Sequence, residues 1–129
     1  MEITVGLQNE AKTVVCETNT AAAIGSGALP VYGTPFMIAL MEEAASTSLQ
    51  PYLAPGQGSV GTHLDVSHEA ATPMGMEVRA VSTVTEVDGR RIVFKVEAFD
   101  ADGRVGSGTH ERFIIDNERF MKKVEAKMK

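Results

Sequence analysis

The clearest pattern in the chain is an apolar segment over residues 34–50, in which hydrophobic positions recur with helical spacing. At 100° per residue its apolar side chains cover an arc of about 220°. They are Phe36, Met37, Ile38, Leu40, Met41, Ala44, Ala45 and Leu49. Thr34 is predicted to cap the helix, with Pro35 in its first turn, and Gln50-Pro51 ends it. A helix this apolar must be wrapped by other elements.

One carboxylate lies at the margin of the apolar arc. Glu42 projects about 20° from Leu49, whereas Glu43 lies in the middle of the polar arc. A charged group at a buried margin costs free energy unless it has a partner or a task. Glu42 is therefore either a solvated surface side chain or a functional group, and the helical period alone favours neither.

The remainder of the chain shows the alternation of apolar and polar residues that is typical of half-buried strands. Strands are predicted over residues 12–18, 59–68, 76–87, 91–101 and 104–116. Asp88-Gly89 and Asp102-Gly103 predict hairpins between the last three strands. A curved antiparallel sheet around one long buried helix satisfies all of these faces. This is the hot-dog fold, an α+β architecture, and residues 1–129 are expected to form one domain.

The connecting segments carry weaker patterns. Residues 1–10 are predicted to be an irregular or weakly extended lead-in, and residues 19–33, rich in Ala and Gly, are either a plain loop or a mobile cover over a pocket. Asn117 is predicted to cap a short C-terminal helix. Within Gly106-Ser107-Gly108 the missing side chains predict close approach of another backbone or a ligand.

Composition excludes several classes of function. The formal net charge of −5 argues against binding to nucleic acid or an anionic membrane, and no segment is apolar for long enough to span a bilayer. The N-terminus lacks the pattern of a secretory signal. Cys16 is the only cysteine, which excludes an internal disulfide and favours a cytoplasmic protein; its apolar neighbours predict that it is buried rather than a nucleophile.

Three residues of the predicted core surface carry the chemistry. His68 shares the apolar face of its strand with Val60, Leu64 and Val66, so it is aimed at the helix, whereas His63 and Gly61 fall on the opposite face. A lone inward histidine is usually a hydrogen-bonded core residue. Together with the hydroxyl of Thr34 and the carboxylate of Glu42, however, it supplies groups for acyl transfer. Eight residues of straight helix separate Thr34 from Glu42 by about 12 Å, so the two cannot touch directly.

Other catalytic and ligand-binding patterns are missing. The sequence has no P-loop, no dinucleotide-binding glycine motif, no CxxC and no HExxH. His63, Asp65 and His68 do not share one face, so no metal site is expected.

Several segments resemble the fluoroacetyl-CoA thioesterase-like hot-dog family, from about residue 20 to residue 120. The segments that carry the resemblance are Thr34-x-x-Met37-x-x-Leu40-Met41-Glu42, Ser59-x-Gly61-Thr62, His68-x-Ala70-Ala71-Thr72-Pro73-x-Gly75, Gly89-Arg90-Arg91 and Gly106-Ser107-Gly108-Thr109-His110-Glu111-Arg112. By this resemblance Thr34, Glu42 and His68 are the catalytic triad, and Gly61 lies against the acyl group. It also implies a homodimeric thioesterase that hydrolyses a small acyl-CoA without a cofactor.

Substrate identity is less constrained. The fluoroacetyl-selective type carries phenylalanines before the central helix, whereas this chain has none between residues 20 and 33, which favours another short acyl-CoA. Arg90 and Arg91 are candidates for binding the CoA phosphates, or else ordinary surface charges. The alternative functions are a non-catalytic acyl-CoA binding module and a hot-dog hydratase or dehydratase, and the joint presence of Thr34, Glu42 and His68 disfavours both.

Overall fold

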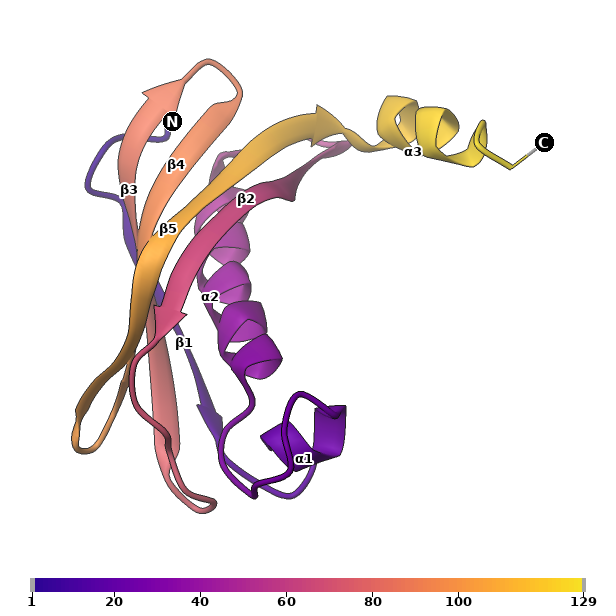
Figure 1. Cartoon of the computed structure of the whole chain (residues 1–129). Coiled ribbons are helices and arrows are strands. Elements are labelled where there is room, and N and C mark those ends of the chain that lie inside the picture. Colours follow the sequence, from indigo (N-terminus) through magenta and orange to yellow (C-terminus); the bar gives the residue numbers. More distant parts are fainter. Residues whose placement is uncertain (1, 129) are drawn as a thin grey trace.

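The computed structural model of the chain describes residues 2–128. Its elements, in order, are β1 (Gln8–Val14), α1 (Ala21–Ile24), α2 (Thr34–Leu49), the short 3₁₀ turn η1 (Gln50–Tyr52), β2 (Gln57–His68), β3 (Glu77–Asp88), β4 (Arg91–Asp100), β5 (Gly103–Asp116) and α3 (Asn117–Glu125). The five strands form one antiparallel sheet in the order β1-β3-β4-β5-β2. The sheet curves around α2, and α3 projects away from the body at the end of β5 (Figure 1). The hot-dog fold predicted from the sequence is confirmed.

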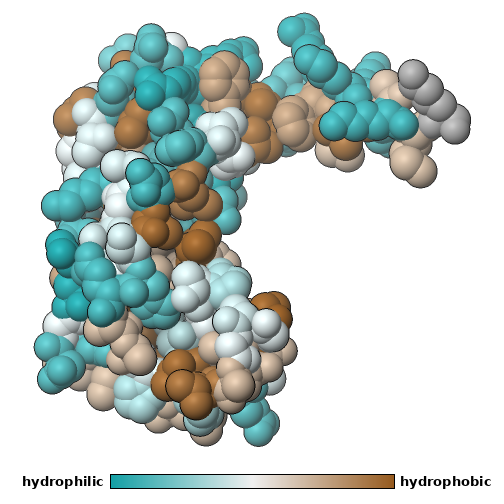
Figure 2. All heavy atoms as spheres, viewed as in Figure 1, coloured by the Kyte–Doolittle hydropathy of each residue, from teal (hydrophilic) through white to brown (hydrophobic). Residues whose placement is uncertain are grey.

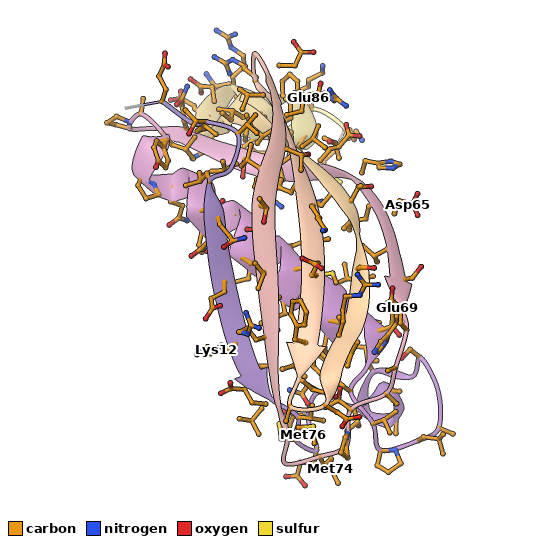
Figure 3. All side chains as sticks on the ribbon, turned by 90° about the vertical axis from the view of Figure 1, so that its left-hand side faces the viewer. Lys12, Asp65, Glu69, Met74, Met76 and Glu86 are labelled. Atoms are coloured by element: carbon orange, nitrogen blue, oxygen red, sulfur yellow. The ribbon has the colours of Figure 1, made fainter. Side chains whose placement is uncertain are left out.

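The core lies between α2 and the concave face of the sheet. Met37, Met41, Ala44 and Leu49 are fully buried on the helix. The alternating residues of β3 and β4 face them, and Val78, Ala80, Val84, Ile92, Phe94, Val96 and Ala98 are all buried. Period-two alternation in these strands therefore predicted the inward face correctly. The outer face of the sheet carries charged side chains such as Lys12 and Glu86, which point away from it (Figure 3).

The first strand begins and ends earlier than the sequence predicted. β1 occupies Gln8–Val14, not residues 12–18, and pairs with β3 from Gln8 opposite Thr83 to Val14 opposite Glu77. Its polar residues are tolerated because β1 is an edge strand in which only Ala11 is buried. After Val14 the chain turns away, so Cys16 is exposed, and the prediction that it is buried was wrong.

Helix starts also differ from the predictions by one residue. Gly33, not Thr34, occupies the N-cap position of α2, and no side chain caps this helix. At α3 the cap is Asp116, whose carboxylate accepts a hydrogen bond from the N–H of Arg119, rather than Asn117. The segment between β1 and α2 contains the four-residue helix α1, capped by Thr20, which the Ala- and Gly-rich composition did not reveal. The hydroxyl of Thr34 is thereby free for another partner.

A β-bulge reorganises the first half of β2. Residues of β2 and β5 pair in register except between Gly61 and His63, where Thr62 is the extra residue. An extra residue shifts the alternation of inward and outward side chains by one position, so residues before the bulge face the side opposite to the one that an uninterrupted strand predicts. Gly61 therefore faces α2 together with Val66 and His68, and the prediction that Gly61 lies on the opposite face was wrong.

The two edges of the sheet differ in how well they are protected. β1 is seven residues long and carries Glu10 and Lys12. β2 is twelve residues long, and its middle is exposed. Apolar side chains also gather in the hollow below the projecting helix α3 (Figure 2). A long, exposed edge strand is a template for pairing with another strand.

Candidate functional site

A threonine and a histidine meet at the start of α2. The hydroxyl of Thr34 lies 2.7 Å from Nδ1 of His68, which ends β2. Because Thr34 is in the first turn and not at the cap, its hydroxyl is available for this bond. The prediction that His68 faces the helix is confirmed. Its second ring nitrogen, Nε2, is shielded from solvent and has no hydrogen-bond partner among residues 2–128.

The pair opens into a hollow of about 300 Å³. Its walls come from the segment that contains α1 and from the residues after β2, and they are Ala21, Ser26, Val31, Tyr32, Thr34, His68, Glu69, Ala70 and Ala71. Tyr32 is buried and donates its hydroxyl to the carbonyl of Phe36, and burial raises its pKa to about 12. Tyr32 is thus a neutral wall of the hollow near neutral pH.

Burial also sets the charge state of His68. Burial lowers the pKa of the imidazole below the ordinary 6.5, against the smaller opposing effect of the nearby backbone of Ala70. The neighbouring carboxylate of Glu69 is already bound by the hydroxyl of Ser107 and by Arg104, which lower its pKa. Glu69 lies at the far end of β2 (Figure 3). The imidazole of His68 is therefore neutral at physiological pH.

Glu42 lies in a second set of contacts, further along α2. Its carboxylate is half-buried and faces Arg112 of β5, with Oε2 3.5 Å from Nη1 of the guanidinium. A Cβ atom on Gly61 would lie 2.7 Å from the same Oε2. Gly61 thus leaves the room that this carboxylate occupies, and the expectation that Glu42 lies at the buried margin is confirmed, whereas Glu43 is exposed.

The second set of contacts contains residues for which the sequence suggested no role. Arg112 and His110 are buried on the inward face of β5, and Ser59 of β2 bonds to Arg112. Their positions follow from the alternation that turns Gly106 toward Met37 of α2. Extending that alternation through Gly108 to residues 110 and 112 would have placed a histidine and an arginine beside the helix.

Within one chain the structure does not bring the three predicted catalytic residues together. Thr34 and His68 form one set of contacts and Glu42 the other, and the helix separates them by about 12 Å along its axis. The expected gap between Thr34 and Glu42 is therefore present.

The two arginines expected to bind CoA phosphates have different surroundings. Arg91 is held by two carboxylates, with Nε 2.8 Å from Glu111 and Nη1 2.9 Å from Glu86. Arg90 donates to the carbonyl of Ile114 and lines a hollow of about 370 Å³ at the base of α3. Arg119 and Lys123 also line that hollow. Arg90 therefore belongs to a basic surface, and Arg91 already has its charge compensated.

Neither a metal site nor a membrane span is found in the described part of the chain. Residues 2–128 contain no group of three or more His, Cys, Asp or Glu side chains placed to hold a metal ion. No helix over the same residues is long and apolar enough to cross a membrane.

Comparison with known proteins places the chain among thioesterases. Residues 15–118 match the family described as fluoroacetyl-CoA-specific thioesterase. The chain is 46% identical to a fluoroacetyl-CoA thioesterase of Streptantibioticus cattleyicolor over 97 aligned residues. The aligned segment covers 75% of this chain and 70% of that protein. A solved fluoroacetyl-CoA thioesterase structure superimposes with a TM-score of 0.93 at 37% identity over 100% of both chains. A mutant of such an enzyme with fluoroacetate and CoA bound matches with a TM-score of 0.87 at 39% identity, over 92% of this chain and 99% of that one.

Proposed function

Since the chain belongs to the fluoroacetyl-CoA-specific thioesterase family, we propose that it hydrolyses the thioester of a short acyl-CoA to the free acid and CoA, using Thr34, His68 and Glu42. The observation that carries the site assignment is the 2.7 Å contact between the Thr34 hydroxyl and a half-buried, neutral His68. A hydroxyl bonded to a neutral imidazole is the arrangement that activates a nucleophile or a water molecule.

The proposed reaction uses each group for one task. With Nδ1 of His68 as acceptor, the imidazole takes a proton from Thr34 or from a water that Thr34 orients. The activated oxygen bonds to the thioester carbon, the carbon–sulfur bond breaks, and the leaving thiolate of CoA takes up the proton held by His68. When the oxygen is that of water, the acid is released directly; when it is that of Thr34, a second water, which gives its proton to Glu42, hydrolyses the acyl-threonine ester to the acid and the free hydroxyl. In the alternative route Glu42 attacks the carbonyl itself, and water then hydrolyses the resulting anhydride to the acid and the free carboxylate.

The 12 Å separation within one helix leads us to propose that the site is shared by two copies of the chain. β2 is a long, exposed edge strand, and a second copy can add to it in antiparallel orientation. Antiparallel pairing sets the His68 end of one strand beside the Ser59–Gly61 end of the other. Thr34 and His68 of one copy would then face Glu42 of the partner, so the homodimer completes the site.

A short acyl group is favoured by what surrounds the pair. The hollow beside Thr34 and His68 is small, at about 300 Å³, and the missing side chain of Gly61 leaves the room that the Glu42 carboxylate occupies. The cover formed by residues 20–33 presents Ile24 and Leu29, both exposed, and no aromatic ring except the buried Tyr32. We therefore expect an acetyl- or propionyl-sized substrate without strong selection for fluorine. The single cysteine is in keeping with a cytoplasmic enzyme.

The proposal is tested by following release of free CoA thiol from acetyl-, fluoroacetyl-, propionyl-, hexanoyl- and palmitoyl-CoA. We expect the highest kcat/KM among the two- and three-carbon substrates, with fluoroacetyl- and acetyl-CoA within about tenfold of each other, a difference of about 1.4 kcal/mol. Binding of acyl-CoA without thiol release would indicate a non-catalytic binding module. A preference for long chains would contradict the assignment of the small hollow as the acyl site.

A further inference from the structure

A buried arginine has an unusually complete set of partners beside Glu42. Arg112 is 7% exposed and uses all three of its nitrogens: Nε donates to the hydroxyl of Ser59, Nη2 to the carbonyl of Ser59, and Nη1 reaches His110. Nη1 also lies 3.5 Å from the carboxylate of Glu42. A guanidinium bound on every side in this way has a fixed orientation.

The histidine in this set is held in one tautomer. Nδ1 of His110 lies 2.9 Å from the carbonyl of His63, and because a carbonyl can only accept, Nδ1 must carry the hydrogen. Nε2 then carries a lone pair, which can accept a hydrogen bond from Arg112 only while the ring is neutral. Burial lowers the pKa of His110 and so favours that neutral state. His110 thereby acts as an acceptor for a buried cation.

We infer that Arg112 is a positioning residue for Glu42: it fixes the place of the carboxylate against Gly61 and supplies its counter-charge. Arg112 is the one ion-pair partner that Glu42 has among residues 2–128, and it lies on the inward side of the sheet, away from the solvent-facing arginines. A group that accepts a proton or attacks a carbonyl carbon must be held in the productive geometry, and a guanidinium of fixed orientation can hold the carboxylate there. This inference rests on the catalytic task proposed for Glu42.

The kinetic test compares three changes with one control in CoA release from acetyl-CoA. Arg112→Met should lower kcat by at least about tenfold with KM changed less than about threefold, because a misplaced catalytic group slows the chemical step. Arg112→Lys should recover part of the loss, and Ser59→Ala, which removes one bond to Arg112, should lie between Arg112→Lys and wild type. Arg79→Met is the control, since Arg79 pairs with Glu10 on the outer face. Loss of activity in the control equal to that of Arg112→Met would contradict the inference.

A second measurement does not depend on activity. Unfolding by denaturant of Arg112→Met, Glu42→Gln and the double variant should show coupling, with the double variant less destabilised than the sum of the two single changes, because each single change strands the other group. Additive effects would overturn the inference. The inference would also be overturned if Glu42→Gln were inactive while Ser59→Ala or Arg112→Lys kept the wild-type kcat. If wild type releases no thiol from any acyl-CoA, the proposed function fails instead.

Discussion

Subunit complementation tests most directly how Thr34, His68 and Glu42 work together. The perturbation is a pair of variants that remove one group each without changing side-chain size: Thr34→Val, which lacks the hydroxyl bonded to His68, and Glu42→Gln, which lacks the carboxylate beside Arg112. Neither hydroxyl nor carboxylate caps α2, so both variants should fold. Each homodimer is expected to lose at least about a hundredfold in kcat/KM, the usual size of a lost acid–base group.

The geometry gives the expected result for a mixed dimer. Thr34 and Glu42 of one chain are about 12 Å apart along the helix axis, whereas reacting groups must approach within about 3.5 Å. If each site takes Thr34 and His68 from one chain and Glu42 from the other, a dimer of the two variants contains one intact site and one doubly defective site. Its activity should then be about half that of the wild-type dimer.

The assay uses the two variants co-expressed with different tags, purified in sequence over both, and followed by release of CoA thiol from acetyl-CoA. Sedimentation of the purified species should give twice the chain mass of 13.8 kDa. A mixed dimer with no more activity than its two parents would refute the shared site, because sites built within single chains would each keep one lesion. A monomer at micromolar concentration would refute it as well.

Three further predictions concern single groups. Thr34→Ser should keep most activity, whereas Thr34→Val should lose it. Both variants should melt close to the wild-type temperature, because Gly33 and not Thr34 is the N-cap of α2. A loss of stability in Thr34→Val that parallels its loss of activity would show a structural role. Glu42→Gln should abolish most thiol release and cost at most about 1 kcal/mol of unfolding free energy, since the carboxylate is partly exposed, whereas Glu43→Gln should change neither. Burial lowers the pKa of His68 below 6.5, so its neutral, active form persists until the pH falls through that lowered value; the acidic limb of kcat/KM should lie below pH 6.5, and a limb above 7 would contradict this.

The fold was predictable because two periods dominate this sequence. The apolar arc of residues 34–50 matches the buried face of α2, and alternation in residues 76–101 matches the inward faces of β3 and β4. Where burial is one-sided and weak, as in β1, the pattern failed: an edge strand with one buried residue leaves almost no alternation to detect. Because β1 ends at Val14 and not at residue 18, Cys16 lies beyond the strand and is exposed.

The site was predictable only in part, for a different reason. Thr34, Glu42 and His68 could be found from their chemistry and their faces, but the bulge at Thr62 inserts one residue that no local signal announces, and so Gly61 changes sides. His110 and Arg112 were within reach of the alternation from Gly108, yet a buried arginine is so uncommon that pattern alone argues against it. Only the partners of the guanidinium explain why it lies there.

The location of these groups links assembly to chemistry. His68, Gly61 and Ser59 all belong to β2, an edge strand that pairs with β5 on one side only, and Thr34 and Glu42 lie on the helix behind it. A site formed on an edge strand remains open to water until that edge is covered, and in water a thioester carbonyl gains little from a nearby charge. Pairing of β2 with a second copy would exclude water and join the two sets of contacts in one step. In the proposed arrangement an isolated chain would hold every proposed catalytic group and still lack a working site.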